Sequence, residues 1–346
     1  MSNVPSIWLA KTPGIQYVSV NASGILSEYA GGLADLSRRA ALDASTSMMA
    51  YSMSKTITAV AVLQLMEAGK VGLDDAVARY VDGLPYPDVT VRQLLSHTSG
   101  IPNPIPLRWV HPAAAHAGFS ETAALAEVLR KHSRLSFRPG TRYRYSNIGY
   151  WLLGSIVERA SGLAFTDYID AHIVRPLGLT TRDMGYAIPD PADHASGYLE
   201  RYSFMNLLKG FLIDRELVGR STGRWVEIRR HHVNSAAFGG LVGTARAFGV
   251  FLQDQLRDRS ALIGANAKRV LYDPRQAVPG RDVAMTLGWH VGKVGGHQHF
   301  FKEGGGGGFH CLMRLYPERG LGTVVMTNAT AFPVHRFLDE TDGDIG

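Results

Sequence analysis

The sequence predicts an α+β (α/β) fold, in which an antiparallel sheet built from both ends of the chain is flanked by helices and interrupted by an inserted, mainly helical domain. Strand-like runs occur near both termini, and helical patterns fill the residues between them. The 346 residues, of which 45% are hydrophobic, suffice for a large core. We therefore expect two subdomains with the active site between them.

The predicted sheet draws its strands from residues 15–35, 299–303 and 309–328. The first range divides into two strands at a Ser-Gly turn at 23–24, and the last divides at 317–320, where proline and glycine favour a tight turn. Residues 1–50 plus 285–346 are accordingly assigned to the sheet subdomain.

Residues 51–284 are predicted to form the mainly helical subdomain. Helical patterns begin near residues 53, 120, 148, 165 and 244. The first helix is apolar on all sides from Ile57 to Met66, which is typical of a helix buried in a core. Gly69 and Gly162 stand where left-handed caps would end the first and third helices.

Charge and cysteine content narrow the class of protein. The net charge is +6, but basic residues are scattered except at 224–232, and no nucleic-acid-binding motif accompanies them. We therefore expect no nucleic-acid partner. The single cysteine, Cys311, excludes an internal disulfide framework and lies in an apolar run, so we expect a buried structural thiol.

The N-terminus lacks a basic start followed by a long apolar segment, and no run of about 18 apolar residues occurs. We expect no membrane partner and a cytoplasmic location, with a periplasmic one only if a leader had been removed. The sequence does not predict the oligomeric state.

Ser52 and Lys55 stand one helical turn apart at the head of the first helix. A serine hydroxyl is a weak nucleophile until a base removes its proton, and a lysine in a dry site can do this if its pKa falls from about 10.4 toward neutrality. The structural alternative is that Ser52 caps the helix and Lys55 is a solvated charge. Spacing alone does not decide, because such a pair occurs by chance about once in a chain of this length.

Two further polar clusters adjoin apolar segments. Residues 145–147, Tyr-Ser-Asn, precede a predicted helix that the serine or asparagine could also cap. Lys302 ends a predicted strand and is followed by Glu303 and five glycines, 304–308. No Gly-Lys-Ser/Thr closes the glycine run and a strand follows it, so we expect the close approach of another backbone or a substrate rather than a phosphate loop.

Ser-x-x-Lys at 52–55, Tyr-x-Asn at 145–147 and Lys-x-Gly at 302–304 together resemble the motifs of the serine beta-lactamase and penicillin-binding-protein superfamily. The Tyr-x-Asn form is similar to the class C beta-lactamase branch, which also holds DD-peptidases, D-aminopeptidases and family VIII carboxylesterases. The resemblance covers about residues 15–330 and includes 91–102, 236–253, 287–289 and 315–328. It implies a beta-lactamase/transpeptidase-like fold.

The resemblance also implies catalytic roles. Ser52 would form the acyl-enzyme with Lys55 against its hydroxyl, and Tyr145 would act with Lys55 as the general base. Because a phenol has a reference pKa of about 10, the cations Lys55 and Lys302 are expected to hold Tyr145 anionic. Asn147 would bind the substrate amide or Lys55.

The third motif would bind the substrate. Lys302 would orient a substrate carboxylate, and the backbone N–H groups of Ser52 and Gly305, beside Gly304, would form the oxyanion hole. Beta-lactamases have Lys-Thr-Gly here, whereas this chain has Glu303 in place of the threonine. In a strand Glu303 points opposite to Lys302; if it instead reached the pocket, it would bind substrate there, repel a carboxylate and favour esters or uncharged amides.

Other features leave their function open. Residues 187–235 do not match the family and are expected to form either a surface excursion or a lid over the active site. Four histidines stand in two pairs, at 231–232 and at 297 and 299, but lack the partners of a metal motif, so no metal or cofactor is predicted.

Two classes of function are consistent with these patterns. One is a serine hydrolase acting on small esters, amides or beta-lactams, with an ester preference and with beta-lactamase or D-amino-acid peptidase activity as alternatives. The other is a binding or scaffold protein without turnover. The presence of all five required side chains, Ser52, Lys55, Tyr145, Asn147 and Lys302, favours the enzyme.

Overall fold

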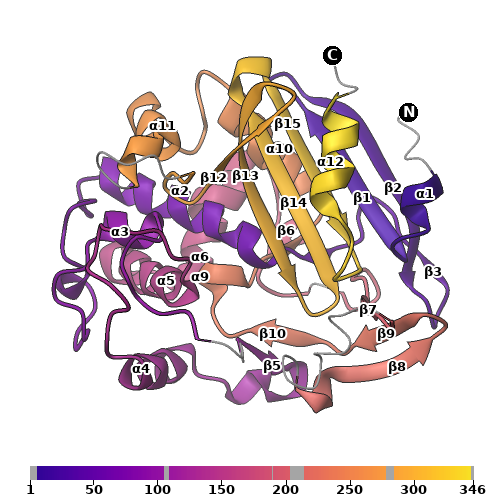
Figure 1. The fold of residues 1–346 in the computed structure, drawn as a ribbon, viewed down its shortest axis with the longest axis horizontal. Coiled ribbons are helices and arrows are strands. Elements are labelled where there is room, and N and C mark those ends of the chain that lie inside the picture. Colours follow the sequence, from indigo (N-terminus) through magenta and orange to yellow (C-terminus); the bar gives the residue numbers. More distant parts are fainter. Residues whose placement is uncertain (1–5, 105–108, 189, 203–213, 278–283, 344–346) are drawn as a thin grey trace.

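The main sheet of the computed structural model has seven strands in the order β12-β13-β14-β15-β1-β2-β3 (Figure 1). The structure describes residues 6–104, 109–188, 190–202, 214–277 and 284–343. The strands of the main sheet are β1 (Gly14–Val20), β2 (Ile25–Asp35), β3 (Ala40–Ala41), β12 (His290–Val294), β13 (His297–Gly306), β14 (Phe309–Tyr316) and β15 (Leu321–Thr327).

The two ends of the chain meet inside this sheet. Strand β1 pairs antiparallel with β15, from Ile15 opposite Thr327 to Val20 opposite Gly322. The predicted fold class is therefore confirmed, and β12 and β3 extend the sheet beyond the five strands that the sequence predicted.

Helices cover both faces of the sheet. On one face lie α1 (Ser6–Leu9) and α12 (Val334–Gly343), where Trp8 and Phe337 pack edge to face with ring centroids 5.4 Å apart. On the other face, α10 (Ala245–Leu256) packs so closely that a Cβ on Gly249 would lie 2.9 Å from Val18. Figure 1 shows α12 lying across the strands of the sheet. The sequence patterns predicted α10 but not α1 or α12.

The helical part occupies the chain between β3 and β12. Its helices are α2 (Ser54–Glu67), α3 (Val91–Leu95), α4 (Glu121–Lys131), α5 (Asn147–Ser161), α6 (Phe165–Ile169), α9 (Ala236–Gly239) and α11 (Ala265–Tyr272). Helix α2 is buried on nearly every side, as its composition predicted. Gly69 and Gly162 have φ angles of 69° and 77°, which confirms both left-handed helix ends.

Short helical turns, tighter than an α-helix except in the π-helix η4, join these elements. They are η1 (Tyr51–Met53), η2 (Val77–Arg79), η3 (Ala113–Gly118), the π-helix η4 (Asp170–Val174), η5 (Arg175–Leu177), η6 (Arg215–Leu217), η7 (Pro274–Gln276) and η8 (Pro317–Arg319). None of the helices that the structure describes is long and apolar enough to span a lipid bilayer.

Three short sheets accompany the helices. Their strands are β4 (Met48–Met49), β5 (Val110–Pro112), β6 (Met184–Gly185), β7 (Gly197–Glu200), β8 (Val218–Thr222), β9 (Trp225–Ile228), β10 (His231–Val233) and β11 (Val242–Gly243), which pair as β4-β11-β6, β5-β10 and β7-β9-β8. Strands β7 to β10 belong to the predicted lid at 187–235. Most of its amphipathic stretch, 203–213, lies outside the described residues.

Candidate active site

Ser52 lies in a tight turn, η1, that leads directly into α2. The preceding residue, Tyr51, has a φ of 43°, an unusual conformation for a bulky side chain. Its hydroxyl is held 2.8 Å from His231 Nε2 and donates a hydrogen bond to the carbonyl of Gly307 at 3.0 Å. These contacts hold the turn in a conformation that the free chain would rarely adopt.

The Ser52 hydroxyl contacts two candidate proton carriers. Its Oγ lies 3.0 Å from Lys55 Nζ and 2.7 Å from Tyr145 Oη. The N-cap residues of η1 and α2 are Ala50 and Met53, and neither position has a side-chain capping hydrogen bond. Ser54 instead makes structural bonds, donating to the Tyr51 carbonyl at 2.6 Å and accepting from Leu241 N at 3.1 Å. The alternative that Ser52 serves only as a cap is therefore wrong.

Lys55 is fully buried, so it is not a solvated charge. Its Nζ donates to Asn147 Oδ1 at 2.9 Å and to the carbonyl of Phe238 at 2.6 Å. Burial, and secondly the charge of Lys302, lower the pKa of Lys55 well below its usual value. A neutral amine has two N–H groups and one lone pair, so the two carbonyl acceptors leave the lone pair for the Ser52 hydroxyl.

Helix α5 and His97 position the second motif. Ser146 Oγ accepts a hydrogen bond from Gly149 N at 3.2 Å and so caps α5, which places Asn147 in the first turn facing Lys55. His97 Nδ1 accepts from Ser146 N at 3.2 Å, and its ring centroid lies 4.4 Å from that of Tyr145. Burial lowers the pKa of His97 well below its usual value, so His97 is a neutral support for the tyrosine.

The prediction that nearby lysines hold Tyr145 anionic is wrong. Burial raises the pKa of the Tyr145 phenol well above its usual value, and the hydrogen bond with Ser52 offsets only part of this rise. Burial also lowers the pKa of Lys302 to about 7. The same desolvation that disfavours a phenolate thus also disfavours the positive charges that would have stabilised it.

Lys302 faces aromatic rings rather than the open pocket. It is fully buried, and its Nζ lies 5.5 Å from the ring centre of Tyr145 and 5.8 Å from that of Tyr150. Within the described part of the chain its Nζ has no hydrogen-bond partner. In this arrangement Lys302 is not placed to bind a carboxylate at the pocket surface.

The glycine run brings β13 against η1, the turn that contains Ser52, which confirms the predicted close approach. A Cβ on Gly304 would lie 2.1 Å from the Ala50 carbonyl oxygen and 3.1 Å from Ser52 N, and one on Gly306 would lie 2.4 Å from the Tyr51 ring. Cys311 Sγ lies buried at hydrogen-bond distance, 3.2 Å, from the carbonyl oxygens of Ala50 and Gly304. The expectation of a buried structural thiol is confirmed.

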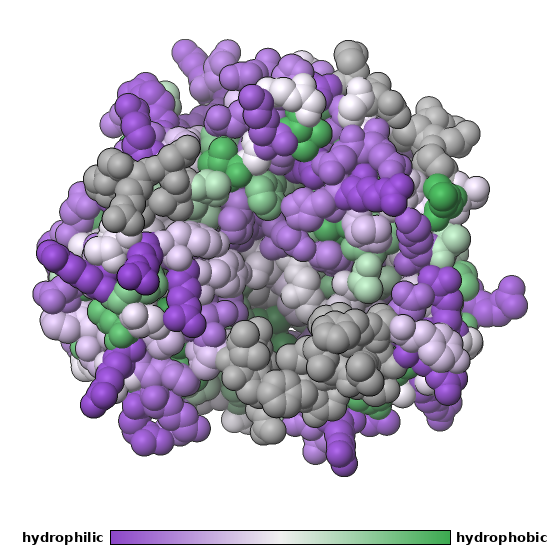
Figure 2. Space-filling model, in the orientation of Figure 1, coloured by the Kyte–Doolittle hydropathy of each residue, from purple (hydrophilic) through white to green (hydrophobic). Residues whose placement is uncertain are grey.

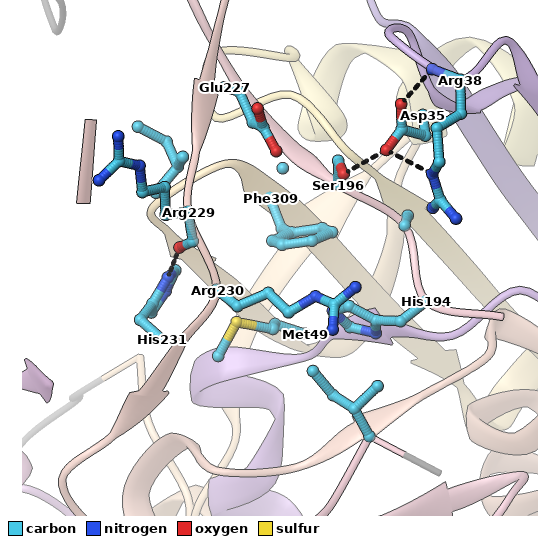
Figure 3. A pocket seen from close by; sticks show the side chains of 14 residues that line it. Asp35, Arg38, Met49, His194, Ser196, Glu227, Arg229, Arg230, His231 and Phe309 are labelled. Atoms are coloured by element: carbon cyan, nitrogen blue, oxygen red, sulfur yellow. Dashed lines mark hydrogen bonds and ion pairs between the residues drawn. The ribbon is translucent and has the colours of Figure 1, made fainter. Parts of the chain in front are cut away.

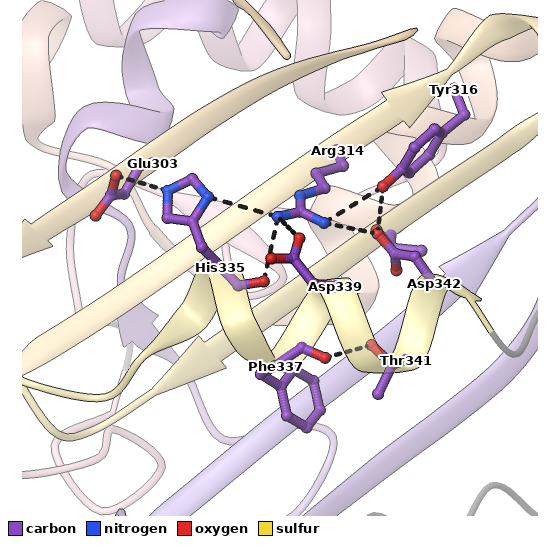
Figure 4. Close-up of polar contacts among 9 residues, drawn as sticks. Glu303, Arg314, Tyr316, His335, Phe337, Asp339, Thr341 and Asp342 are labelled. Atoms are coloured by element: carbon purple, nitrogen blue, oxygen red, sulfur yellow. Dashed lines mark hydrogen bonds and ion pairs between the residues drawn. The ribbon is translucent and has the colours of Figure 1, made fainter. Parts of the chain in front are cut away.

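Glu303 points away from the pocket, which corrects its assignment to substrate binding. Its Oε1 lies 2.6 Å from His310 Nε2, and its Oε2 lies 3.0 Å from His335 Nε2 on α12 (Figure 4). Successive strand residues face opposite sides of the sheet, so burying Lys302 on the inner face places Glu303 on the outer one. Hydrogen bonds from the two histidines lower the pKa of the Glu303 carboxyl below its usual value.

A cavity of about 410 Å³ opens over Ser52, and we call it the reaction pocket. One wall of the pocket is apolar, and no sequence motif marks it. Its side chains are Trp109, Val110, Leu199, Leu217, Ile228, Val233 and Phe238. Four of these come from the predicted lid segment, 187–235. Among the described residues that line the pocket there is no Lys, Arg, Asp or Glu. Figure 2 shows the molecule hollowed near the centre of one face.

A second cavity, of about 230 Å³, is charged rather than apolar. Figure 3 shows Glu227 and Arg230 projecting toward it, while Asp35 accepts hydrogen bonds from Ser196 and Arg38. No sequence motif marks this cavity, because its charged residues come from distant segments of the chain. His231 lines both cavities.

The histidine pairs were not predicted to bind metal. His232 stacks on His116 with ring centroids 3.7 Å apart, and His231 contacts Tyr51. On β13, His297 is exposed and His299 is buried. In the ranges that the structure describes, no three His, Cys, Asp or Glu side chains are grouped to hold a metal ion.

The beta-lactamase family profile matches residues 9–344, nearly the whole chain. The chain belongs to the beta-lactamase family. Members of this beta-lactamase family include serine hydrolases, and the relatives carry esterase, D-aminopeptidase and DD-peptidase names at low identity.

Three relatives illustrate the range of the beta-lactamase family. A penicillin-binding protein of Bacillus subtilis (strain 168) is 25% identical over 320 residues, which are 90% of this chain and 67% of the relative. A D-aminopeptidase of Brucella anthropi is 30% identical over 54% of this chain and 36% of its own length, and esterase EstB of Burkholderia gladioli is 34% identical over 50% and 47%. Against the last two relatives, this chain spans less than half of their length.

Solved structures of similar shape support the same beta-lactamase fold. The octameric penicillin-binding protein homologue from Pyrococcus abyssi has a TM-score of 0.80 at 23% identity, covering 98% of this chain and 75% of that one. The D-amino acid amidase from Ochrobactrum anthropi SV3 complexed with L-phenylalanine has a TM-score of 0.82 at 20% identity, covering 97% and 95%. At these identities the likeness shows the fold alone.

Proposed function

We propose that this chain is a serine hydrolase that forms an acyl-enzyme on Ser52 and prefers neutral esters with an apolar acyl group. The observation that carries the proposal is the placement of Ser52 Oγ within 3.0 Å of Lys55 Nζ and 2.7 Å of Tyr145 Oη at the wall of the reaction pocket. A nucleophile in contact with a desolvated amine and a phenol is the arrangement that acyl transfer requires.

Lys55 is the base that starts the reaction in this proposal. Its lone pair takes the Ser52 proton as Oγ attacks the substrate carbonyl, and the ammonium that forms donates to Asn147 and to the Phe238 carbonyl. The leaving oxygen takes the proton of Tyr145, and Lys55 returns a proton to the phenolate. Water then enters, and the same transfers run in reverse to release the acid and restore Ser52.

The oxyanion would be bound by backbone N–H groups of Ser52 and Gly305. Support comes from the approach of β13 to η1, where a Cβ on Gly304 would stand 3.1 Å from Ser52 N. Backbone donors held in a fixed turn need no reorganisation as negative charge develops.

The pocket lining supports the ester preference. Its side chains are mostly apolar, and its described part offers neither a Lys or Arg for a carboxylate nor an Asp or Glu for the ammonium of a D-amino acid. The ring nitrogens of the two histidines that line it, His231 and His310, already face protein partners. The sequence-based argument for this preference assumed that Glu303 reaches the pocket, and it fails because Glu303 points toward α12. The apolar wall now supports the preference instead.

A substrate panel tests the proposal. We expect p-nitrophenyl butyrate to be cleaved with a higher kcat/KM than nitrocefin or a D-alanyl anilide, and intact-protein mass to show one acyl group that is absent in Ser52→Ala. Faster cleavage of nitrocefin or of the D-alanyl anilide would reject the preference. Absence of any acyl adduct on the wild-type chain would favour a binding protein and reject the enzyme.

A further inference from the structure

His310 lies directly behind the segment that would bind the oxyanion. It pairs with Gly305 across β13 and β14, and a Cβ on Gly305 would lie 3.3 Å from the His310 ring. It also lines the reaction pocket. No sequence motif marked this residue.

Both ring nitrogens of His310 face acceptors. Nδ1 lies 2.6 Å from the carbonyl oxygen of Phe332, which can only accept a hydrogen bond. Nε2 lies 2.6 Å from Glu303 Oε1. The carboxylate of Glu303 likewise only accepts, so both nitrogens carry hydrogen in this geometry, which makes the ring an imidazolium.

The neighbouring histidine, His335, faces one donor and one acceptor. Its Nδ1 faces the Arg314 guanidinium at 3.5 Å, and since arginine only donates, Nδ1 accepts. Its Nε2 therefore carries the hydrogen and donates to Glu303 Oε2 at 3.0 Å. His335 is thus an acceptor toward Arg314 and a donor toward Glu303 in this arrangement.

Arg314 fixes the far end of the network. It is 1% exposed and is held by Asp339 at 2.7 Å and Asp342 at 3.3 Å, as Figure 4 shows. The titratable and charged groups facing His310 are thus Glu303 on β13 and His335 on α12, with Arg314 behind His335. A continuous set of hydrogen bonds joins α12 to the back of the glycine segment.

We propose that His310 is a positioning residue that stays protonated, and that Glu303 and His335 keep it so. Its two charge-assisted hydrogen bonds hold the Gly304–Gly306 end of β13 against β14, and its positive charge stands beside the point where the substrate oxygen becomes negative. The inference rests on the proposed function, because it concerns the same acyl transfer.

The protonation of His310 is measured by ring ¹⁵N NMR of the full chain, with the signal assigned by its loss in His310→Gln. At about pH 7.5, where a free histidine is mostly neutral, we expect both nitrogens of His310 to carry hydrogen. In Glu303→Gln we expect the ring to become neutral. A neutral His310 in the wild-type chain overturns the proposal, and a ring that stays protonated in Glu303→Gln overturns the role of Glu303.

Kinetics test whether the charge matters for the reaction. We expect Glu303→Gln to lower kcat for a neutral ester by about tenfold at about pH 7.5, with little change in KM, and to recover toward acid pH as His310 regains its proton. Glu303→Asp should restore part of the loss. The matched control is His297→Gln, an exposed histidine on the same strand, which should leave kcat unchanged.

Two results separate this inference from the proposed function. A wild-type chain that forms no acyl-enzyme rejects the proposed function. A wild-type chain that acylates Ser52, with a pH profile that Glu303→Gln leaves unaltered, rejects the positioning role of His310 alone. The NMR measurement is made on the wild-type chain, and a variant is needed only to assign the His310 signal. If His310→Gln does not fold, His310→Asn can serve for that assignment.

Discussion

Lys55 and Lys302 place their amines 4.9 and 5.5 Å from the centre of the same aromatic ring, that of Tyr145. Both side chains are fully buried, and the hydrogen bonds described for Lys55 Nζ go to neutral oxygens. Two uncompensated ammonium groups in such a place would repel each other at low dielectric. The pair is therefore suited to carry one proton in the proposed reaction rather than to hold two charges at rest.

The pH dependence of stability should reveal the buried Lys302. Its folded pKa of about 7 lies below the unfolded value of about 10.4, so the unfolded chain binds more protons between these values and the unfolding free energy rises with pH across that window. This group alone adds a slope of up to about 1.4 kcal/mol per pH unit. Lys302→Met should remove that contribution.

Urea unfolding at several pH values between about 7 and about 10 measures the difference between Lys302→Met and the wild type. The stability advantage of the methionine variant should be greatest near pH 7 and shrink toward pH 10. A difference that stays constant over this range would show that Lys302 keeps an ordinary pKa in the folded chain.

Ser52→Ala should abolish turnover and fluorophosphonate labelling while leaving the fold intact. The Ser52 hydroxyl makes no helix cap, so we expect the unfolding free energy to change by no more than about 1 kcal/mol. Ser54→Ala is the matched control, because it leaves Leu241 N without its acceptor and should cost about 1–3 kcal/mol while labelling persists. Labelling of Ser52→Ala at any other serine would contradict the assignment.

Lys55 and Tyr145 should act as one unit, because both contact Ser52 Oγ. Lys55→Ala and Tyr145→Phe are each expected to reduce kcat by about a hundred- to ten-thousandfold. The double variant should be scarcely slower than the worse single variant, as measured in a double-mutant cycle with p-nitrophenyl butyrate. Penalties that multiply would mean that the two groups serve separate steps.

The sequence predicted the side chains that meet around Ser52 better than it predicted their surroundings. The three motifs led to Ser52, Lys55, Tyr145, Asn147 and Lys302, because each sits at the start of a helix or in a strand whose pattern is visible locally. The Phe238 carbonyl that accepts from Lys55 could not be found this way, since a backbone oxygen carries no residue signature.

The contacts of Glu303 illustrate a second limit. Its partners, His310 and His335, come from a neighbouring strand and a terminal helix, and only strand register and helix docking bring them to it. The protonation of Tyr145 was mispredicted for a related reason, because burial cannot be read from a motif. Pairwise charge arguments fail when desolvation is the larger effect.

Glu303→Thr is now expected to leave substrate preference unchanged. Because Glu303 points toward α12, the ratio of kcat/KM for nitrocefin to that for p-nitrophenyl butyrate should stay within about twofold of the wild type. The unfolding free energy should fall by about 1–3 kcal/mol, since His310 and His335 lose their acceptor. A rise in the nitrocefin ratio of about tenfold would restore the interpretation that the side chain reaches substrate.

A cation introduced into the apolar wall should change the preference instead. Val233→Arg places a guanidinium in the reaction pocket, where it can pair with a substrate carboxylate. We expect kcat/KM for nitrocefin to rise relative to p-nitrophenyl butyrate by about tenfold, or about 1.4 kcal/mol. Val233→Met controls for size and should not alter the ratio. Equal ratios in both variants would place the carboxylate of bound substrate elsewhere.

The pairing of β1 with β15 sets the point in synthesis at which this chain can assemble the proposed active site. Ile15 finds its partner only after Thr327 has left the ribosome, and β13, which carries Lys302 and the glycines, needs β14 beside it. Contacts between residues so distant along the chain make folding slow, and the helical part is synthesised before the sheet can form. The nascent chain would therefore carry Ser52 as an unreactive alcohol until β15 has been synthesised, and the proposed hydrolysis would begin only after that point.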